Sequence, residues 1–169
     1  MFCPGDCIKH RIDFTCYYIF VTYQYNYDRG NVQIIYFLMR KLIIEKTEST
    51  PLIILDPVEK VYEISGQSRP SDVREFYDQI ISWLNDFIVF LKDSKEYTDP
   101  IVFIFNLDYF NSSSSKLIVD ICKILAGMKT RGYNVVVKWH YEEGDVDMLD
   151  VGKEISQIVN CPFEYIETA

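Results

Sequence analysis

The sequence is poor in the residues and motifs that most enzyme sites require. Its 169 residues include seven glycines and two histidines, and it contains neither a P-loop nor a G-x-G-x-x-G motif for cradling nucleotides. It also lacks a G-x-S-x-G motif, and a serine nucleophile needs a base nearby. His10 lies in an atypical opening segment, and His140, in VKWHY, is typical of a half-exposed strand. We therefore keep a small serine hydrolase only as the least favoured alternative and expect no catalytic residues.

A basic stripe and an unbroken long apolar run are missing too. The net charge is −8, whereas proteins that bind phosphate backbones carry clustered lysine and arginine. Nucleic acid and anionic membranes are therefore not expected partners. Polar residues interrupt the apolar opening segment, which excludes a signal peptide or a membrane span there. About half of the residues are apolar and a quarter are charged, as in one globular domain.

The five cysteines are not expected to form a disulfide or metal framework. Cys122 and Cys161 are isolated within apolar segments, so we expect buried thiols in a reducing compartment and a cytoplasmic protein. The cysteines near the start, with one histidine, could be taken for a zinc cluster, but their spacing matches none of the usual C-x-x-C frameworks. We expect no metal and no cofactor. The residues of this disfavoured cluster are Cys3, Cys7, His10 and Cys16.

Residues 1–38 differ from the rest of the chain. They carry three basic and three acidic residues, so the whole acidic excess lies in 39–169. They show no sustained helix or strand period, whereas a strand pattern begins directly after Met39. We therefore expect 1–38 to be a doubtful N-terminal extension, either disordered or produced by a mis-set start, and 39–169 to be the folded domain.

From Met39 onward, strand and helix patterns alternate. Short apolar runs predict strands, and Asp72 is placed to cap a helix whose apolar residues recur every three to four positions. Gly132 is placed to end a second helix, and a third should face inward through Met148, Val151, Ile155 and Ile158. This order predicts an α/β (α+β) fold, a mixed β-sheet with three helices packed mainly on one face. The predicted strands are 42–44, 52–55, 61–64, 101–107, 135–141 and a closing edge at 162–167, and the helices begin near 72, 112 and 146.

Four consecutive serines, 112–115, fall where the apolar strand 101–107 gives way to the second helix. Serine can cap a helix by accepting from free backbone N–H groups, but four exceed what a cap needs. A helix N-terminus also tolerates an added dianion. The run is therefore either a cap with a tight turn or a phosphoacceptor. The carboxylates in 142–147 are interpreted as a solvated helix start, with a weak cation site as the alternative.

Three stretches together resemble the SiaC family of bacterial regulatory phosphoproteins: ISGQSRPSDVREFYDQIISWL, LDYFNSSSSKLIVDICKIL and VVVKWHY. That family has a fold similar to the STAS domain of anti-sigma-factor antagonists. In the family, the hydroxyl residue after the asparagine of a tyrosine–x–asparagine stretch is phosphorylated. The matching position is Ser112, after Tyr109 and Asn111, with Ser113 and Ser114 as alternatives.

The resemblance implies a non-enzymatic protein in a partner-switching circuit. A kinase phosphorylates it, a metal-dependent type 2C-like phosphatase reverses this, and the unmodified form binds and activates a diguanylate cyclase, which raises cyclic di-GMP and promotes biofilm. An anti-sigma-factor antagonist, or a scaffold for another effector, is the alternative. The expected partner-binding residues are Tyr109, Asn111, Ser113, Ser114, Ser115, Lys116, Ser65, Gly66, Ser68 and Pro70.

Overall fold

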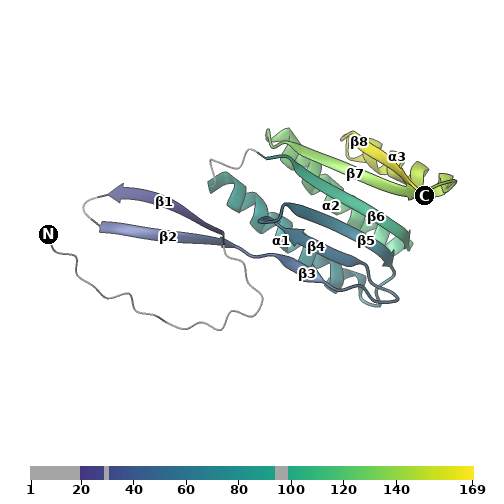
Figure 1. The fold of residues 1–169 in the computed structure, drawn as a ribbon, viewed down its shortest axis with the longest axis horizontal. Helices are drawn as coiled ribbons and strands as arrows, with labels where there is room; N and C mark the ends of the chain where they lie inside the picture. The colour runs from purple at the N-terminus through teal and green to yellow at the C-terminus, as the bar shows by residue number, and fades with distance from the viewer. Residues whose placement is uncertain (1–19, 29–30, 94–98) are drawn as a thin grey trace.

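The computed structural model describes the backbone of residues 20–28, 31–93 and 99–169, with side chains over 39–92 and 99–169. Within these ranges the chain forms a two-stranded sheet, a six-stranded sheet and three helices (Figure 1). The strands are β1 (Phe20–Asp28), β2 (Asn31–Met39), β3 (Leu42–Ile44), β4 (Leu52–Asp56), β5 (Val61–Ser68), β6 (Ile101–Phe110), β7 (Val135–Glu142) and β8 (Phe163–Thr168). The helices are α1 (Val73–Asp93), α2 (Ser112–Thr130) and α3 (Val146–Ile158).

The six-stranded sheet is mixed, and its strand order follows the chain. The order is β3-β4-β5-β6-β7-β8, antiparallel across β3, β4 and β5 and parallel from β5 to β8. Parallel neighbours are joined by right-handed crossovers, and three successive crossovers in one direction place all their helices on the same face. Figure 1 shows α1, α2 and α3 behind the sheet. The predicted α/β fold, a mixed sheet with three helices on one face, is confirmed.

The core lies between the sheet and the helices. Along β6, Ile101, Phe103, Phe105 and Leu107 are buried while the residues between them are at least partly exposed, because successive strand side chains point to opposite faces. Aromatic rings fill much of the space under α1, where Trp83 stacks on Phe87 with ring centroids 5.0 Å apart. Cys122 and Cys161 are free and buried, as predicted, and burial raises the pKa of the Cys122 thiol.

Predicted helix signals are largely confirmed. Asp72 caps α1 by accepting from the N–H of Glu75 at 2.9 Å, and Gly132 follows α2 with φ of +94°. The inward position predicted for Ile158 is wrong, because this side chain is 64% exposed. Val159, four residues after Ile155, packs against the core instead.

The hairpin of β1 and β2 is an element that the sequence patterns did not predict. The two strands pair antiparallel from Phe20–Met39 to Asp28–Asn31 and form a sheet of their own. These strands are rich in aromatic and β-branched residues, which favour extended structure, and the interpretation of 1–38 as a doubtful extension stays a prediction. The disfavoured zinc cluster of Cys3, Cys7, His10 and Cys16 lies outside the described residues.

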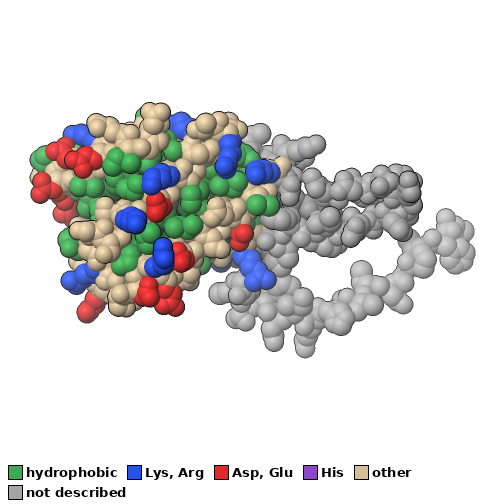
Figure 2. Space-filling model, turned by 180° about the vertical axis from the view of Figure 1, so that it is seen from behind, with side chains coloured by type: hydrophobic (Ala, Val, Ile, Leu, Met, Phe, Trp, Pro, Cys, Tyr) green, Lys and Arg blue, Asp and Glu red, His purple; other side chains and the backbone are tan. Residues whose placement is uncertain are grey.

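The helix side of the molecule, seen in Figure 2, mixes apolar side chains with scattered charges of both signs. Val89 on α1 and Val146 on α3 are large apolar residues that remain exposed. No helix in the described part of the chain combines the length and apolar character needed to cross a bilayer.

We expect a chain that starts at Met39 to fold about as stably as the full chain. Met39 is 3% exposed, and the carbonyl of Arg40 accepts from Trp83 Nε1 at 2.5 Å, so this truncation keeps both contacts. A chain that starts at Lys41 loses both, and deleting a buried methionine side chain costs about 2–5 kcal/mol.

Thermal unfolding of the three chains checks this prediction. The midpoint should change by no more than a few degrees for the first truncation and fall further for the second, since about 1 kcal/mol corresponds to roughly 2–4 °C at this chain length. A large drop already on removal of residues 1–38 would show that the hairpin belongs to the folded unit.

Candidate functional site

The four serines occupy the first turn of α2, directly after β6, but they are not equivalent. Ser112 and Ser113 are exposed, and Ser115 is half-buried. Ser114 is fully buried, with 0% of its surface exposed. In this conformation, two of the four hydroxyls are open to an approaching molecule and one is enclosed by the fold.

The cap of α2 is Asn111 rather than a serine. Its backbone is extended, with φ −83° and ψ 169°, and its Oδ1 accepts from the N–H of Ser114 at 2.8 Å. Its carbonyl accepts from the N–H of Ser115 at 2.9 Å. The serines therefore do not fill the capping role that the sequence left open for them. The first turn contains no acidic residue, and Lys116 follows it with an exposed side chain.

A chain of buried hydroxyl groups lies beneath this turn. Ser68 Oγ donates to Ser114 Oγ at 3.0 Å, and Ser114 Oγ donates to the carbonyl of Ser68 at 3.1 Å. Ser68 Oγ also lies 2.7 Å from the hydroxyl of Tyr77 on α1. All three residues are essentially inaccessible to solvent, so their polar groups are satisfied by one another rather than by bulk water.

Hydroxyl chemistry sets the direction of this chain. A serine or tyrosine hydroxyl carries one proton, and the proton of Ser68 is already donated to Ser114. The Tyr77 hydroxyl is therefore the donor in its bond with Ser68. Burial raises the pKa of Tyr77 to about 12, partly offset by its hydrogen bond with Ser68 and by the nearby Ser114 hydroxyl, so Tyr77 stays protonated and keeps donating at neutral pH.

The segment SGQSRP, residues 65–70, lies next to the serine run. β5 and β6 are parallel neighbours with Ser68 paired to Phe110, and the N–H of Asn111 donates to the carbonyl of Ser68 at 3.1 Å. Ser65 lies further back, half-buried on the strand face that helices do not cover. Pro70 is buried, so it, Ser68 and Ser114 cannot touch a partner directly in this conformation.

A bulge in the β5–β6 pairing decides which side chains reach the surface. Gly66 pairs with Leu107, but the next residue pairs with Tyr109, so Asp108 is left without a partner in the ladder. Gly66 has φ of +91°, which a residue without Cβ adopts easily. Because of the extra residue, each later side chain of β6 points to the opposite face of the sheet from the one that strict alternation would give it. Tyr109 is therefore 51% exposed, while the Phe110 ring meets Trp139 edge-on.

An open groove runs beside this bulge, with a volume of about 610 Å³. It forms because the turn between β3 and β4 is fastened to the residue after β5: the N–H of Arg69 donates to the carbonyl of Ser49 at 2.8 Å, and its guanidinium donates to the carbonyl of Glu48 at 3.4 Å. The groove is lined by Lys46, Thr47, Glu48, Gly66, Gln67, Arg69 and Asp108.

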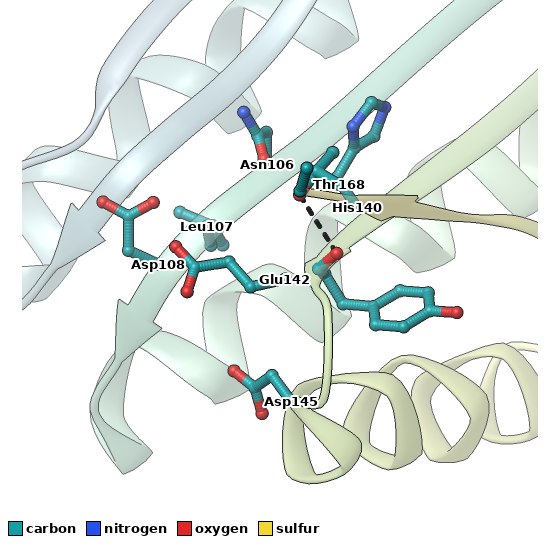
Figure 3. A pocket seen from close by; sticks show the side chains of 9 residues that line it. Asn106, Leu107, Asp108, His140, Glu142, Asp145 and Thr168 are labelled. Carbon is teal, nitrogen blue, oxygen red and sulfur yellow. Dashed lines mark hydrogen bonds between the residues drawn. The ribbon is translucent and has the colours of Figure 1, made fainter.

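A smaller pocket of about 170 Å³ lies at the ends of β6, β7 and β8 (Figure 3). Carboxylates of Asp108, Glu142 and Asp145 line it, and Asp145 caps α3 by accepting from the N–H of Met148 at 2.9 Å. Across the part of the chain that the structure describes, no three potential metal-ligating groups come together as a metal site would require. Asp145 therefore serves the start of α3, which is the helix start that the sequence indicates.

His140, which also lines this pocket, is a half-buried strand residue, as the sequence indicates. Desolvation lowers its pKa, nearby Lys138 lowers it further, and Glu63 opposes both. The imidazole is therefore held largely neutral near pH 7. In the described part of the chain, no hydrogen-bond partner contacts its buried Nε2 atom.

Comparison with known proteins shows which family the chain belongs to. A sequence profile described as SiaC family regulatory phosphoprotein matches residues 44–168. The chain belongs to the SiaC family. A Pseudomonas aeruginosa (strain UCBPP-PA14) protein named Uncharacterized protein PA14_02130 is 30% identical over 125 residues, which are 74% of this chain and 94% of that protein.

Solved SiaC structures share the fold. Apo-SiaC from Pseudomonas aeruginosa superposes with a TM-score of 0.64 at 28% identity, covering 76% of this chain and 98% of that chain. A crystal structure of the diguanylate cyclase SiaD in complex with its activator SiaC, from the same organism, gives a TM-score of 0.66 at 27% identity, covering 75% and 99%. The resemblance read from the three sequence stretches is confirmed as family membership.

Sequence reasoning missed two parts of this candidate site. One is Tyr77, predicted only as part of the apolar stripe of α1; a tyrosine at a core position needs a partner for its hydroxyl, which is a usable signal. The other is the turn around Thr47, which the fold brings to Gly66 and which no local pattern marks.

Replacing Asn111 by alanine should lower the free energy of unfolding by about 1 kcal/mol, because the variant loses the side-chain acceptor for the N–H of Ser114. Replacement by aspartate keeps an acceptor and adds a negative charge at the helix start, so it should be close to neutral. Urea unfolding of both variants and of wild type checks this. Equal stability of the alanine variant would show that the cap contributes nothing.

Proposed function

We propose that this chain is a non-enzymatic regulatory phosphoprotein of a cytoplasmic partner-switching circuit, phosphorylated at Ser112. The observation that carries the proposal is the placement of Ser112: it is exposed, begins α2 and directly follows the capping Asn111 in a member of the SiaC family. Ser113 is the alternative acceptor because it is exposed too. The buried, twice-bonded hydroxyl of Ser114 is unsuited to a kinase unless the turn opens.

The local electrostatics favour a phosphate at this point. A phosphoserine carries roughly −1.5 to −2 charges at neutral pH, and the N-terminus of a helix interacts favourably with negative charge. The first turn of α2 contributes no acid. Lys116 lies one turn beyond Ser112, the spacing at which helical side chains meet. A phosphate therefore adds charge to this surface without destabilising the helix that bears it.

The proposed effector is a diguanylate cyclase, which the unmodified form binds and activates. Support comes from the relative of matching fold that is described as the activator of SiaD and crystallised with that cyclase. The circuit needs two further partners, a kinase and a type 2C-like phosphatase, that act on the same serine. Cyclic di-GMP and biofilm formation are the proposed output.

The proposed contact surface joins the exposed members of the two segments. Tyr109 supplies a large exposed ring, and the groove beside Gly66 provides a hollow of about 610 Å³ into which a partner side chain can insert. A phosphate on Ser112 would repel an acidic or apolar partner and add bulk at the helix start. The residues proposed for direct contact are Tyr109, Ser112, Ser113, Lys116, Gly66 and Gln67.

The effect of Ser112 on partner binding is the central prediction. A diguanylate cyclase captured from the source cells, and then purified, should bind wild type and Ser112→Ala equally and Ser112→Asp more weakly, with kinase-treated protein weakest. Aspartate supplies one charge and fewer acceptor oxygens than phosphate, so its effect is partial. Calorimetric titration measures the affinities, and conversion of GTP to cyclic di-GMP measures activation.

Lys123→Ala is a matched control, because it alters an exposed α2 residue further along the helix, where Lys123 pairs with Asp120. It should leave both affinity and activation unchanged. Equal binding by phosphorylated and unmodified protein would rule out the switch. Capture of a different effector enzyme in place of a cyclase would instead support the alternative function, a scaffold for another effector.

Two substitutions at Gly66 distinguish the effect of backbone strain from the effect of a bulky side chain in the groove. Both Gly66→Ala and Gly66→Trp must adopt φ near +91°, which costs roughly 1 kcal/mol or more in each, and no atom lies within 4 Å of the added Cβ. The two variants should therefore unfold at similar urea concentrations. Cyclase affinity should fall much further for Gly66→Trp, and equal affinities would exclude the groove from the contact surface.

A further inference from the structure

The two exposed segments of the proposed contact surface are joined from beneath by groups that no partner can reach. Ser68 belongs to the first segment and Ser114 to the second, 46 positions apart, and their hydroxyls bond to each other. The carbonyl of Ser68 accepts from both Ser114 Oγ and the N–H of Asn111. These bonds connect the capped first turn of α2 directly to the end of β5.

Tyr77 extends this connection to α1. Its ring lies in the core and its hydroxyl donates to Ser68 Oγ, which frees the Ser68 proton for Ser114. Hydrogen bonds in series polarise one another, so losing one member weakens the rest. The chain runs from Tyr77 through Ser68 to Ser114, and the backbone of Ser114 is in turn held by the side chain of Asn111.

We propose that Tyr77 is a positioning residue for the switch: acting through Ser68 and Ser114, it holds the Ser112 turn and the SGQSRP segment in the relative arrangement that the partner recognises. This rests on the proposed function, because recognition at Ser112 is what the positioning serves. Tyr77 is 0% exposed, so any effect of its hydroxyl on partner binding passes through the residues it contacts.

The first test needs no partner. Amide hydrogen exchange at Ser114 and Ser115, whose N–H groups bond to Asn111, should be about 2- to 10-fold faster in Tyr77→Phe, the range expected for loss of one net hydrogen bond. The first turn of α3 is an internal reference, since the N–H groups of Met148 and Leu149 bond to Asp145 in the same way without a hydroxyl chain beneath them.

A matched variant controls for the loss of a buried tyrosine hydroxyl. Tyr62 is equally buried and packs against Phe87 in the core, so Tyr62→Phe makes the same chemical change elsewhere. It should leave the ratio of exchange rates between the two capped turns unchanged. If Tyr77→Phe alters α2 and α3 equally, or alters neither, the positioning role is overturned.

The second test uses the purified cyclase as probe. Tyr77→Phe should weaken its binding by about 2- to 10-fold, and this loss should vanish in the Ser114→Ala background, because the link to the surface is then already cut. Additive effects of the two substitutions would overturn the positioning role. If neither the variants nor phosphorylated protein change cyclase binding, the proposed function fails. The hydrogen-exchange test would still show whether Tyr77 holds the Ser112 turn, because it needs no partner.

Discussion

The carbonyl of Ser68, at the last residue of β5, is the point on which the geometry of the site depends. It accepts from the backbone of Asn111 and from the hydroxyl of Ser114, and therefore fixes the start of α2 against the end of the neighbouring strand. An unpaired carbonyl buried there would cost free energy comparable to a lost hydrogen bond. Because this one acceptor must be satisfied, the end of β5, the Asn111 cap of α2 and Ser114 lie together.

The parallel order of β5 to β8 places this junction at one edge of the domain. β5, β6 and β7 are each followed by a helix on the same side of the sheet, so the starts of α2 and α3 both lie beyond the carboxyl ends of strands. Both starts use the same capping chemistry, with Asn111 at one and Asp145 at the other. They differ beneath the cap, since the hydroxyl chain of Ser68, Ser114 and Tyr77 lies under α2. The two turns therefore differ in the groups that hold them from beneath as well as in their side chains.

Local signals predicted most of the fold, because most of it is specified locally. The apolar stripe of α1, the Asp72 cap and the Gly132 stop depend on neighbours within a few positions, and the structure has all three. The placement of Ser112 at the start of a helix was predictable for the same reason. The burial of Ser114 was not, because it depends on Ser68, 46 positions away, and a run of identical residues offers no local means of telling its members apart.

The bulge between β5 and β6 has a consequence for how this sequence can vary. Asp108 is the unpaired residue of the ladder, so exchanging its side chain leaves the backbone count intact. Deleting it would remove the bulge and bring Tyr109 directly after Leu107, so Tyr109 would still point away from the helices and Phe110 would still face Trp139. Gln67 and Ser68 would keep Tyr109 and Phe110 as their partners, and the β5–β6 ladder would become regular. Tolerance at this position should therefore extend to a one-residue gap as well as to substitution, so related chains can differ by one residue between Leu107 and Asn111 without changing which side chains face the helices.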